Sequence, residues 1–114
     1  MELAVIKAIC EKHPHDRTSI EAQIATAKVI SRENTSAGFY TYFEVQRSPN
    51  VAIGDARERD QRHGPQAAIK GITYGMGFIL WLRHGYLNCL EGYTYDDSTT
   101  SLDLTNLNFQ IVGP

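Results

Sequence analysis

Hydrophobic residues at the start of the chain recur at helical spacing. Leu3, Ile6 and Cys10 share one broad face, which predicts a helix from about residue 2 to residue 12. Pro14 ends this helix, because proline disfavours the helical conformation in the residue before it and lacks a backbone donor.

Two further patterns follow in the first half of the chain. Thr18 and Glu21 have the spacing of a capping box, so we expect a short second helix that starts there. The hydrophobic period then changes to two, which predicts strands at Ala27 to Asn34 and at Phe39 to Arg47. Turn-forming residues separate these strands, so they form the first predicted hairpin.

The middle of the chain is interpreted as a long exposed connection. Ser48 to Gln66 contains prolines, glycines and a dense run of mixed charge, a composition typical of loops. Loops of this length are uncommon in compact domains and are either functional or mobile, and both interpretations stay open. Ala68 to Tyr74 is then a strand candidate, followed by a bend at Gly75 to Gly77.

The most strongly apolar segment of the chain is YGMGFILWLRHGYLNCLEGYTY. It predicts two strands that turn at His84 and Gly85. A two-residue loop places Leu82 opposite Leu87, whereas a three-residue loop with a glycine bulge places Trp81 there. Both faces carry large apolar side chains in either register, so we expect this hairpin at the centre of the sheet with structure packed on each side.

Together these elements define the fold class. Helices followed by strands, joined mostly by short turns, are typical of an α+β domain. We therefore expect N-terminal helices packed on an antiparallel sheet of about five or six strands. A chain of 114 residues can bury a self-sufficient core, so residues 1–114 are expected to form a single domain. The last strand, with an irregular start, would carry Leu102, Leu104, Leu107, Phe109 and Ile111.

Composition narrows the classes of function. The chain is 42% hydrophobic and 21% charged with a net charge of −2, so we expect no nucleic-acid partner. We expect no membrane partner, because no segment approaches the roughly 20 apolar residues of a membrane span. Glu2 and Lys7 disrupt the N-terminal apolar run, which does not resemble a signal peptide. Cys10 and Cys89 lack metal-site or redox spacing, so we expect free thiols in a cytoplasmic protein.

Glu91 is the polar residue in the most unusual surroundings. It lies between apolar strand residues, where a carboxylate must find hydrogen-bond donors or shift its pKa upward. Tyr93 and Tyr95 share its face at period two, so the three could hold a ligand; packing and structural hydrogen bonds are the alternative. The two-residue register of the hairpin would put Glu91 on the face of Phe78.

Three arginines of the predicted loop are candidates for binding a partner. Arg57, Arg59 and Arg62 interleave with acidic residues, so their charge is locally offset and a solvated face is the alternative.

A compact group of imidazoles and a carboxylate lies between the predicted helices. His13, His15 and Asp16 are ligand types that suit Zn²⁺. No fourth ligand is indicated nearby, so we expect solvated loop side chains, no metal and no cofactor.

Three motifs of the chain stand out: Ile30 to Thr35 followed by Gly38-Phe39, Gly77 to Trp81 followed by Gly85 to Leu87, and Leu90 to Tyr95. They resemble motifs of a group of small uncharacterised bacterial proteins. The resemblance implies no catalytic residues, because that group has no established activity. In size and build the chain also resembles the immunity proteins of bacterial toxin systems.

We therefore expect a non-enzymatic protein-binding module, specifically an immunity protein that neutralises a cognate bacterial toxin with a polar, charged surface. The loop 48–66 and the aromatic faces of the hairpin would supply that surface. The alternative is a small-molecule-binding protein or small enzyme with a cleft near Glu91. An enzyme normally needs a base, an orienting partner and a charge stabiliser, and only the first is visible in the sequence. The oligomeric state is not predicted.

Overall fold

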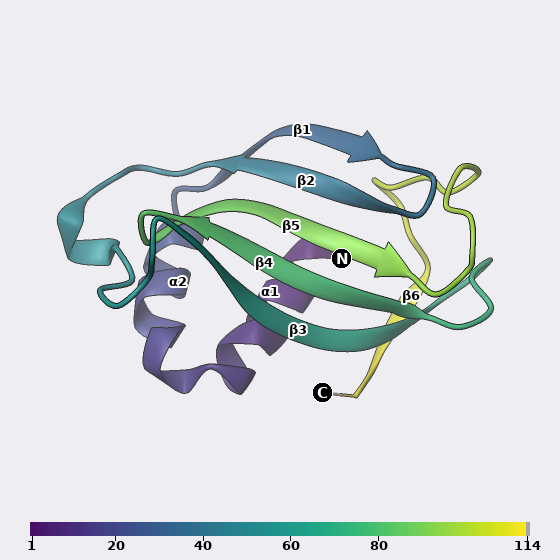
Figure 1. Cartoon of the computed structure of the whole chain (residues 1–114), viewed down its shortest axis with the longest axis horizontal. Helices are drawn as coiled ribbons and strands as arrows, with labels where there is room; N and C mark the ends of the chain where they lie inside the picture. Colours follow the sequence, from purple (N-terminus) through teal and green to yellow (C-terminus); the bar gives the residue numbers. More distant parts are fainter. Residues whose placement is uncertain (114) are drawn as a thin grey trace.

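The computed structural model describes residues 1–113, in which two helices precede a six-stranded sheet (Figure 1). Short 3₁₀ turns at Pro14–Asp16 and Pro49–Val51 lie in the connections. The elements are α1 (Glu2–Lys12), α2 (Arg17–Ile24), β1 (Lys28–Asn34), β2 (Gly38–Glu44), β3 (Arg59–Ile69), β4 (Met76–Arg83), β5 (Tyr86–Thr94) and β6 (Phe109–Gly113).

The sheet is antiparallel throughout, with the strand order β1-β2-β5-β4-β3-β6. The predicted α+β class is therefore confirmed, and the β4–β5 hairpin lies at the centre as expected. Both helices pack against one face of the sheet (Figure 1). No element within residues 1–113 covers the other face, so the prediction of structure on both sides of the central hairpin is wrong. No helix of this part of the chain is long and apolar enough to cross a membrane.

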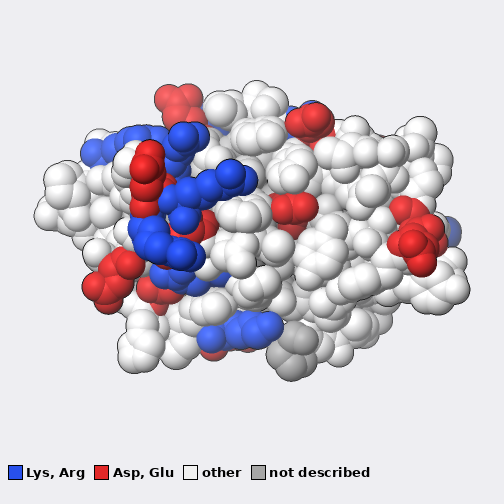
Figure 2. All heavy atoms as spheres, in the orientation of Figure 1, with Lys and Arg blue, Asp and Glu red and all other residues white. Residues whose placement is uncertain are grey.

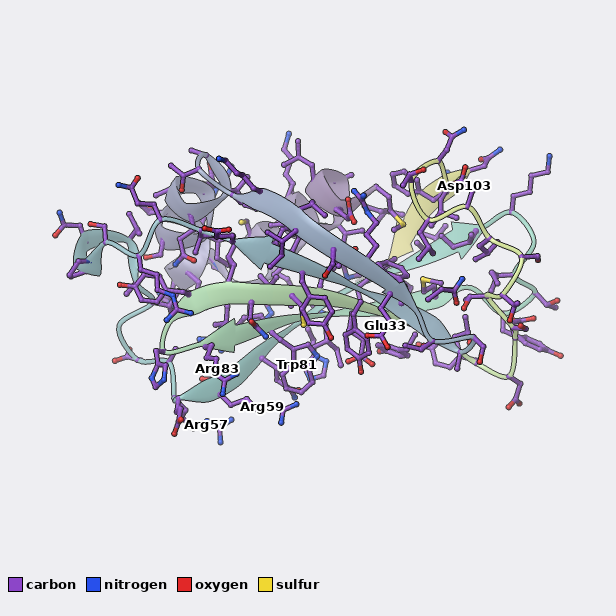
Figure 3. All side chains as sticks on the ribbon, turned by 90° about the horizontal axis from the view of Figure 1, so that it is seen from above. Glu33, Arg57, Arg59, Trp81, Arg83 and Asp103 are labelled. Carbon is purple, nitrogen blue, oxygen red and sulfur yellow. The ribbon has the colours of Figure 1, made fainter. Side chains whose placement is uncertain are left out.

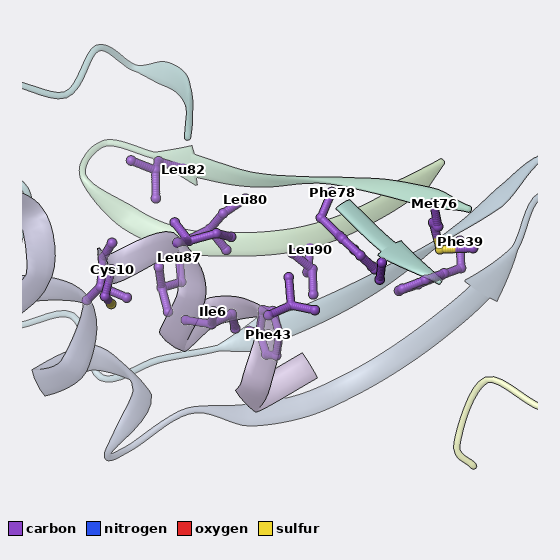
Figure 4. Packing of buried hydrophobic residues seen from close by; sticks show 14 of the residues in the cluster. Ile6, Cys10, Phe39, Phe43, Met76, Phe78, Leu80, Leu82, Leu87 and Leu90 are labelled. Atoms are coloured by element: carbon purple, nitrogen blue, oxygen red, sulfur yellow. The ribbon is translucent and has the colours of Figure 1, made fainter. Parts of the chain in front are cut away.

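The hydrophobic core fills the space between the helices and the sheet (Figure 4). The predicted apolar face of α1 supplies Val5, Ile6 and Ile9, which are almost fully buried. On the sheet, Phe39 of β2 and Phe78 of β4 meet edge to face, with ring centroids 6.3 Å apart. Each large apolar side chain buried in this way contributes roughly 1.5–3 kcal/mol to folding.

Helix α2 starts differently from the prediction. The 3₁₀ turn runs directly into the helix, so Thr18 lies inside α2 and the N-cap residue is Asp16, which makes no side-chain capping bond. The expected capping box is therefore wrong. Glu21 instead accepts a hydrogen bond of 2.6 Å from Arg17, one turn earlier on the same helix.

The predicted loop 48–66 is only partly a loop. Its second half belongs to β3, which extends from Arg59 to Ile69, and the strand expected at 68–74 contributes only its first two residues to that element. A shift in register between His63 and Gln66 accommodates the Gly-Pro pair that suggested a loop. The first half of β3 pairs with β4 alone, and the polar side chains of such an edge segment can face solvent.

A two-residue turn closes the central hairpin. His84 and Gly85 both have positive φ, 52° and 85°, as a type I′ turn requires. Leu82 therefore lies opposite Leu87, which is the first of the two registers left open by the sequence. A Cβ atom on Gly85 would come within 2.7 Å of a backbone oxygen, so the position excludes larger residues.

A bulge then shifts the register by one residue. Asn88 has no residue opposite it, and the next pair joins Trp81 to Cys89. Beyond the bulge Glu91 lies opposite Ile79 and on the face that carries Trp81. The expectation that a two-residue turn would put Glu91 on the face of Phe78 is therefore wrong, because the bulge reverses the facing of every later residue in β5.

The segment before β6 closes one end of the sheet. Thr99 is fully buried there, and its hydroxyl hydrogen-bonds with both backbone polar atoms of Gly38 and with the side chain of Asn34. Of the predicted last strand, Phe109 and Ile111 lie in β6. The three predicted leucines are partly buried against the core from irregular structure.

Candidate functional site

The sheet face turned away from α1 and α2 carries the candidate site, and we call it the open face. Figure 2 looks onto it and shows Lys and Arg side chains gathered towards one end, with Asp and Glu side chains among them. Figure 3 shows that Arg57, Arg59, Arg83 and Trp81 project from this side of the sheet, as does Glu33. The face therefore carries arginine and aromatic side chains near the turn of the central hairpin.

A hollow of about 450 Å³ lies in the open face. Its walls come from neighbouring strands: tyrosines of β2 on one side, and a tryptophan and an arginine of β4 and β3 on the other. The two tyrosine rings, at positions 40 and 42, stack with their centroids 6.0 Å apart. The residues that line the hollow are Tyr40, Tyr42, Arg59, Trp81, Leu82, Arg83, Asn88 and Cys89.

Glu91 is held by the aromatic side chains beside the hollow. The indole N–H of Trp81 donates to Oε1 of Glu91 at 2.9 Å, and the guanidinium of Arg59 lies over the indole ring, 4.9 Å from its centroid. Burial, together with the nearby Glu91 carboxylate, raises the pKa of Tyr40. The carboxylate thus has a hydrogen-bond donor of the kind that the sequence analysis required.

Tyr93 and Tyr95 lie on the same face as Glu91 but outside the hollow. Tyr93 packs over Gly77 of the neighbouring strand, where a Cβ atom would come within 2.4 Å of the tyrosine ring. Tyr95 meets Tyr93 edge to face at 5.7 Å and donates a hydrogen bond of 3.0 Å to Gln66. Both tyrosines therefore have packing partners of their own.

The structure separates the three arginines predicted to bind a partner. Arg59 lies at the hollow, and Arg57 is exposed beside Asp60, at 3.2 Å. Arg62 instead forms an ion pair of 2.6 Å with Asp16, from the turn that precedes α2. Two backbone amides and the nearby guanidinium groups hold the pKa of Asp60 well below its usual range.

The sequence analysis did not identify Arg83 as a site residue. Arg83 lies directly opposite Arg59 in the β3–β4 pair, so the two side chains share a face. Alternation in the sequence puts Tyr40 and Tyr42 on one face of their strand, but no sequence pattern joins them to these arginines. The missing information was the pairing of β3, because that segment was interpreted as a loop.

The two cysteines are free and lie on opposite sides of the sheet. Cys89 forms part of the hollow, where burial and the neighbouring Glu91 carboxylate raise its pKa to about 11. Cys10 belongs to the core, and burial raises its pKa too. Both thiols are therefore protonated at neutral pH and unsuited to nucleophilic attack.

The histidines considered as metal ligands have structural neighbours. Nε2 of His13 lies 3.0 Å from the backbone carbonyl oxygen of His63, and the Asp16 carboxylate is engaged by Arg62. Across residues 1–113, no three His, Cys, Asp or Glu side chains converge on a position where a metal ion could bind.

Comparison of the chain with protein-family models, curated proteins and solved structures gives no match. The resemblance of its motifs to small bacterial proteins therefore remains a prediction. Function has to be argued from the side chains of the open face.

Proposed function

We propose that this chain is a non-enzymatic protein-binding module that docks its partner on the open face. The observation that carries the proposal is the contrast between the two sides of the sheet: helices cover one side, and within residues 1–113 no element covers the other. The uncovered side presents tyrosine, tryptophan and arginine, the residue types enriched at the energetic centres of protein interfaces.

The chemistry of the open face favours binding over catalysis. Glu91 already accepts a hydrogen bond from Trp81, and Cys89 is protonated at neutral pH. A general base or nucleophile must instead reach a substrate in its reactive form, with a third group to orient it. The alternative function, a small-molecule or enzymatic site near Glu91, has less support for this reason.

We extend the proposal to the class of partner: a cognate bacterial toxin that the chain neutralises. The size and build that resemble immunity proteins support this step, as does a rigid face that mixes aromatic and charged groups. Such a face can cover a catalytic surface without undergoing chemistry itself.

Site-specific cross-linking tests the docking surface. A photoreactive amino acid at Tyr42, on the open face, is compared with one at Lys7, on the helical side. We expect a stoichiometric partner to be cross-linked in the source cells from position 42 and not from position 7. The reverse pattern would contradict docking on the open face.

Co-expression tests the finer proposal. The protein encoded immediately upstream of this chain's gene is produced with and without the chain. We expect the upstream protein alone to arrest growth and the parent chain to relieve that arrest. The Tyr42→Ala/Trp81→Ala double variant should not relieve it. Equal relief by the folded double variant would count against neutralisation through this face.

A further inference from the structure

Two arginines oppose each other at the edge of the hollow. Arg59 of β3 and Arg83 of β4 are direct cross-strand neighbours (Figure 3). Side chains in such a pair are about 5 Å apart at their Cβ atoms, and like charges placed there destabilise a sheet. Both arginines line the hollow, so their charges act on the same space.

Neither of these arginines has a carboxylate partner within residues 1–113. The ion pairs formed by arginine involve Arg17, Arg32, Arg57 and Arg62, and none involves Arg59 or Arg83. Two acidic side chains close to the hollow have other neighbours: Glu58 lies 3.9 Å from His84, and Glu91 accepts a hydrogen bond from Trp81. Glu33 also projects from this side of the sheet (Figure 3), but it lies on β1, opposite Tyr40, and forms no ion pair with either arginine. The guanidinium groups of Arg59 and Arg83 can therefore pair with a carboxylate from outside the chain.

The remaining lining suits an acidic group. The guanidinium groups offer forked N–H donors that match the two oxygens of a carboxylate. Asn88 and the two stacked tyrosines also line the hollow, and their side chains contain hydrogen-bond donors.

We propose that this hollow anchors a carboxylate of the protein partner, supplied by an aspartate or glutamate side chain on a protruding acidic loop. The inference rests on the proposed docking function and names the chemistry of the partner at one point of the interface. An incoming carboxylate relieves the repulsion between Arg59 and Arg83 and forms charge-assisted hydrogen bonds with them.

The chain contains a single tryptophan, and it lines the hollow. The fluorescence of Trp81 therefore reports directly on occupation of this site. The probe is the peptide acetyl-Gly-Asp-Asp-Gly-amide, whose only charges are carboxylates. Its matched control is the same peptide with asparagine, and inorganic phosphate is titrated as a third ligand.

We expect a saturable change in fluorescence with the aspartate peptide that weakens as salt is added. Arg59→Gln and Arg83→Gln should each weaken binding about tenfold or more, since each removes a charged donor. Arg83→Lys keeps the charge but loses the fork, so intermediate binding is expected. Arg17→Gln, on the exposed surface of α2, is the control and should bind like the parent.

Three results would overturn the anchor: equal binding of the asparagine peptide, tighter binding of phosphate than of the aspartate peptide, or unchanged binding by both glutamine variants with parental melting temperatures. Partner cross-linking from position 42 without any peptide binding would overturn the anchor and leave the docking function standing. Saturable peptide binding without cross-linking would support the carboxylate site and contradict docking on the open face.

Discussion

A single buried glutamine joins α2 to the central hairpin. The side chain of Gln23 is fully buried, and its amide nitrogen donates to the carbonyl oxygens of Val51, at 2.7 Å, and Gly85, at 2.9 Å. The backbone N–H of Leu87 in turn donates to Oε1 of Gln23 at 2.7 Å. One side chain therefore provides hydrogen-bond partners for backbone groups of the loop before β3, the hairpin turn and the start of β5.

Replacement of Gln23 by leucine keeps the approximate volume and removes all three hydrogen bonds. The carbonyl of Gly85 retains a second bond of 2.9 Å from the amide of Ile53, but the Leu87 N–H and the Val51 carbonyl lose their side-chain partner. An unsatisfied buried polar group costs about 1–3 kcal/mol. The partly buried Val51 carbonyl falls at the lower end of that range, so we expect a total destabilisation of about 2–4 kcal/mol.

Urea denaturation measures this difference. For a slope of about 2 kcal/mol per molar urea, the midpoint should fall by about 1–2 M in Gln23→Leu. Gln46→Leu is the control, because Gln46 is exposed and forms no side-chain hydrogen bond; it should stay within about 0.5 kcal/mol of the parent. A loss of less than about 1 kcal/mol in Gln23→Leu would refute the account.

Three further predictions follow from other contacts. Thr99→Val removes the hydroxyl that bonds both backbone atoms of Gly38 and should cost about 1–3 kcal/mol in urea denaturation; an unchanged midpoint would show that the contact contributes nothing. Burial alone would raise the pKa of Glu2, but hydrogen bonds from Arg32 and Thr41 outweigh it and lower that pKa. This stabilisation is present above the unfolded-state pKa of about 4.3 and is lost as pH falls through the folded value, so the destabilisation by Arg32→Gln should be larger at pH 7 than at pH 3. Glu91→Gln should cost no more than about 1–2 kcal/mol, keep partner binding and lower the pKa of Tyr40 towards its ordinary value in an ultraviolet titration; loss of a small-molecule interaction in the folded variant would favour the alternative function.

The alternation of hydrophobic residues in strands and their helical spacing in α1 predicted much of the fold. These patterns arise because only one side of such an element is buried in the core. In the alternating pattern from Phe39 to Arg47, Phe39, Thr41 and Phe43 fall on one face of the predicted strand, and all three are buried. The helix predicted at residues 2–12 matches α1 in the same way. Such elements can be predicted because each has one face in contact with the core, and that face is visible within a short segment of the sequence.

β3 could not be predicted in this way, since its first half carries polar side chains on both faces. Arg59 lies on the open face and Arg62 reaches the turn before α2, so neither face of this segment is apolar. The Gly-Pro pair that follows is a turn signal in the sequence, but here it falls at a bulge within the strand. Pairing with β4 overrides the local preference.

Prediction of the site failed for the same reason and for one more. The pairing of Arg59 with Arg83 exists only if the first half of β3 is a strand. The face on which Glu91 lies also depends on the bulge at Asn88, and no local conformational preference in the hairpin sequence predicts that bulge. Which residues line the hollow is therefore decided by strand pairing and cannot be predicted from any one segment.

The same glutamine offers a physical reason for that bulge. β2 pairs with β5 only as far as Cys89, so the Leu87 amide, just before the bulge, has no partner in that strand and donates to Gln23 instead. If this bond holds the bulge in place, α2 sets the register that brings Glu91 to the indole of Trp81 on the far side of the sheet. The emission of Trp81 in folded Gln23→Leu should then differ from that of the parent and of Gln46→Leu. Unchanged emission would mean that strand pairing alone maintains the bulge.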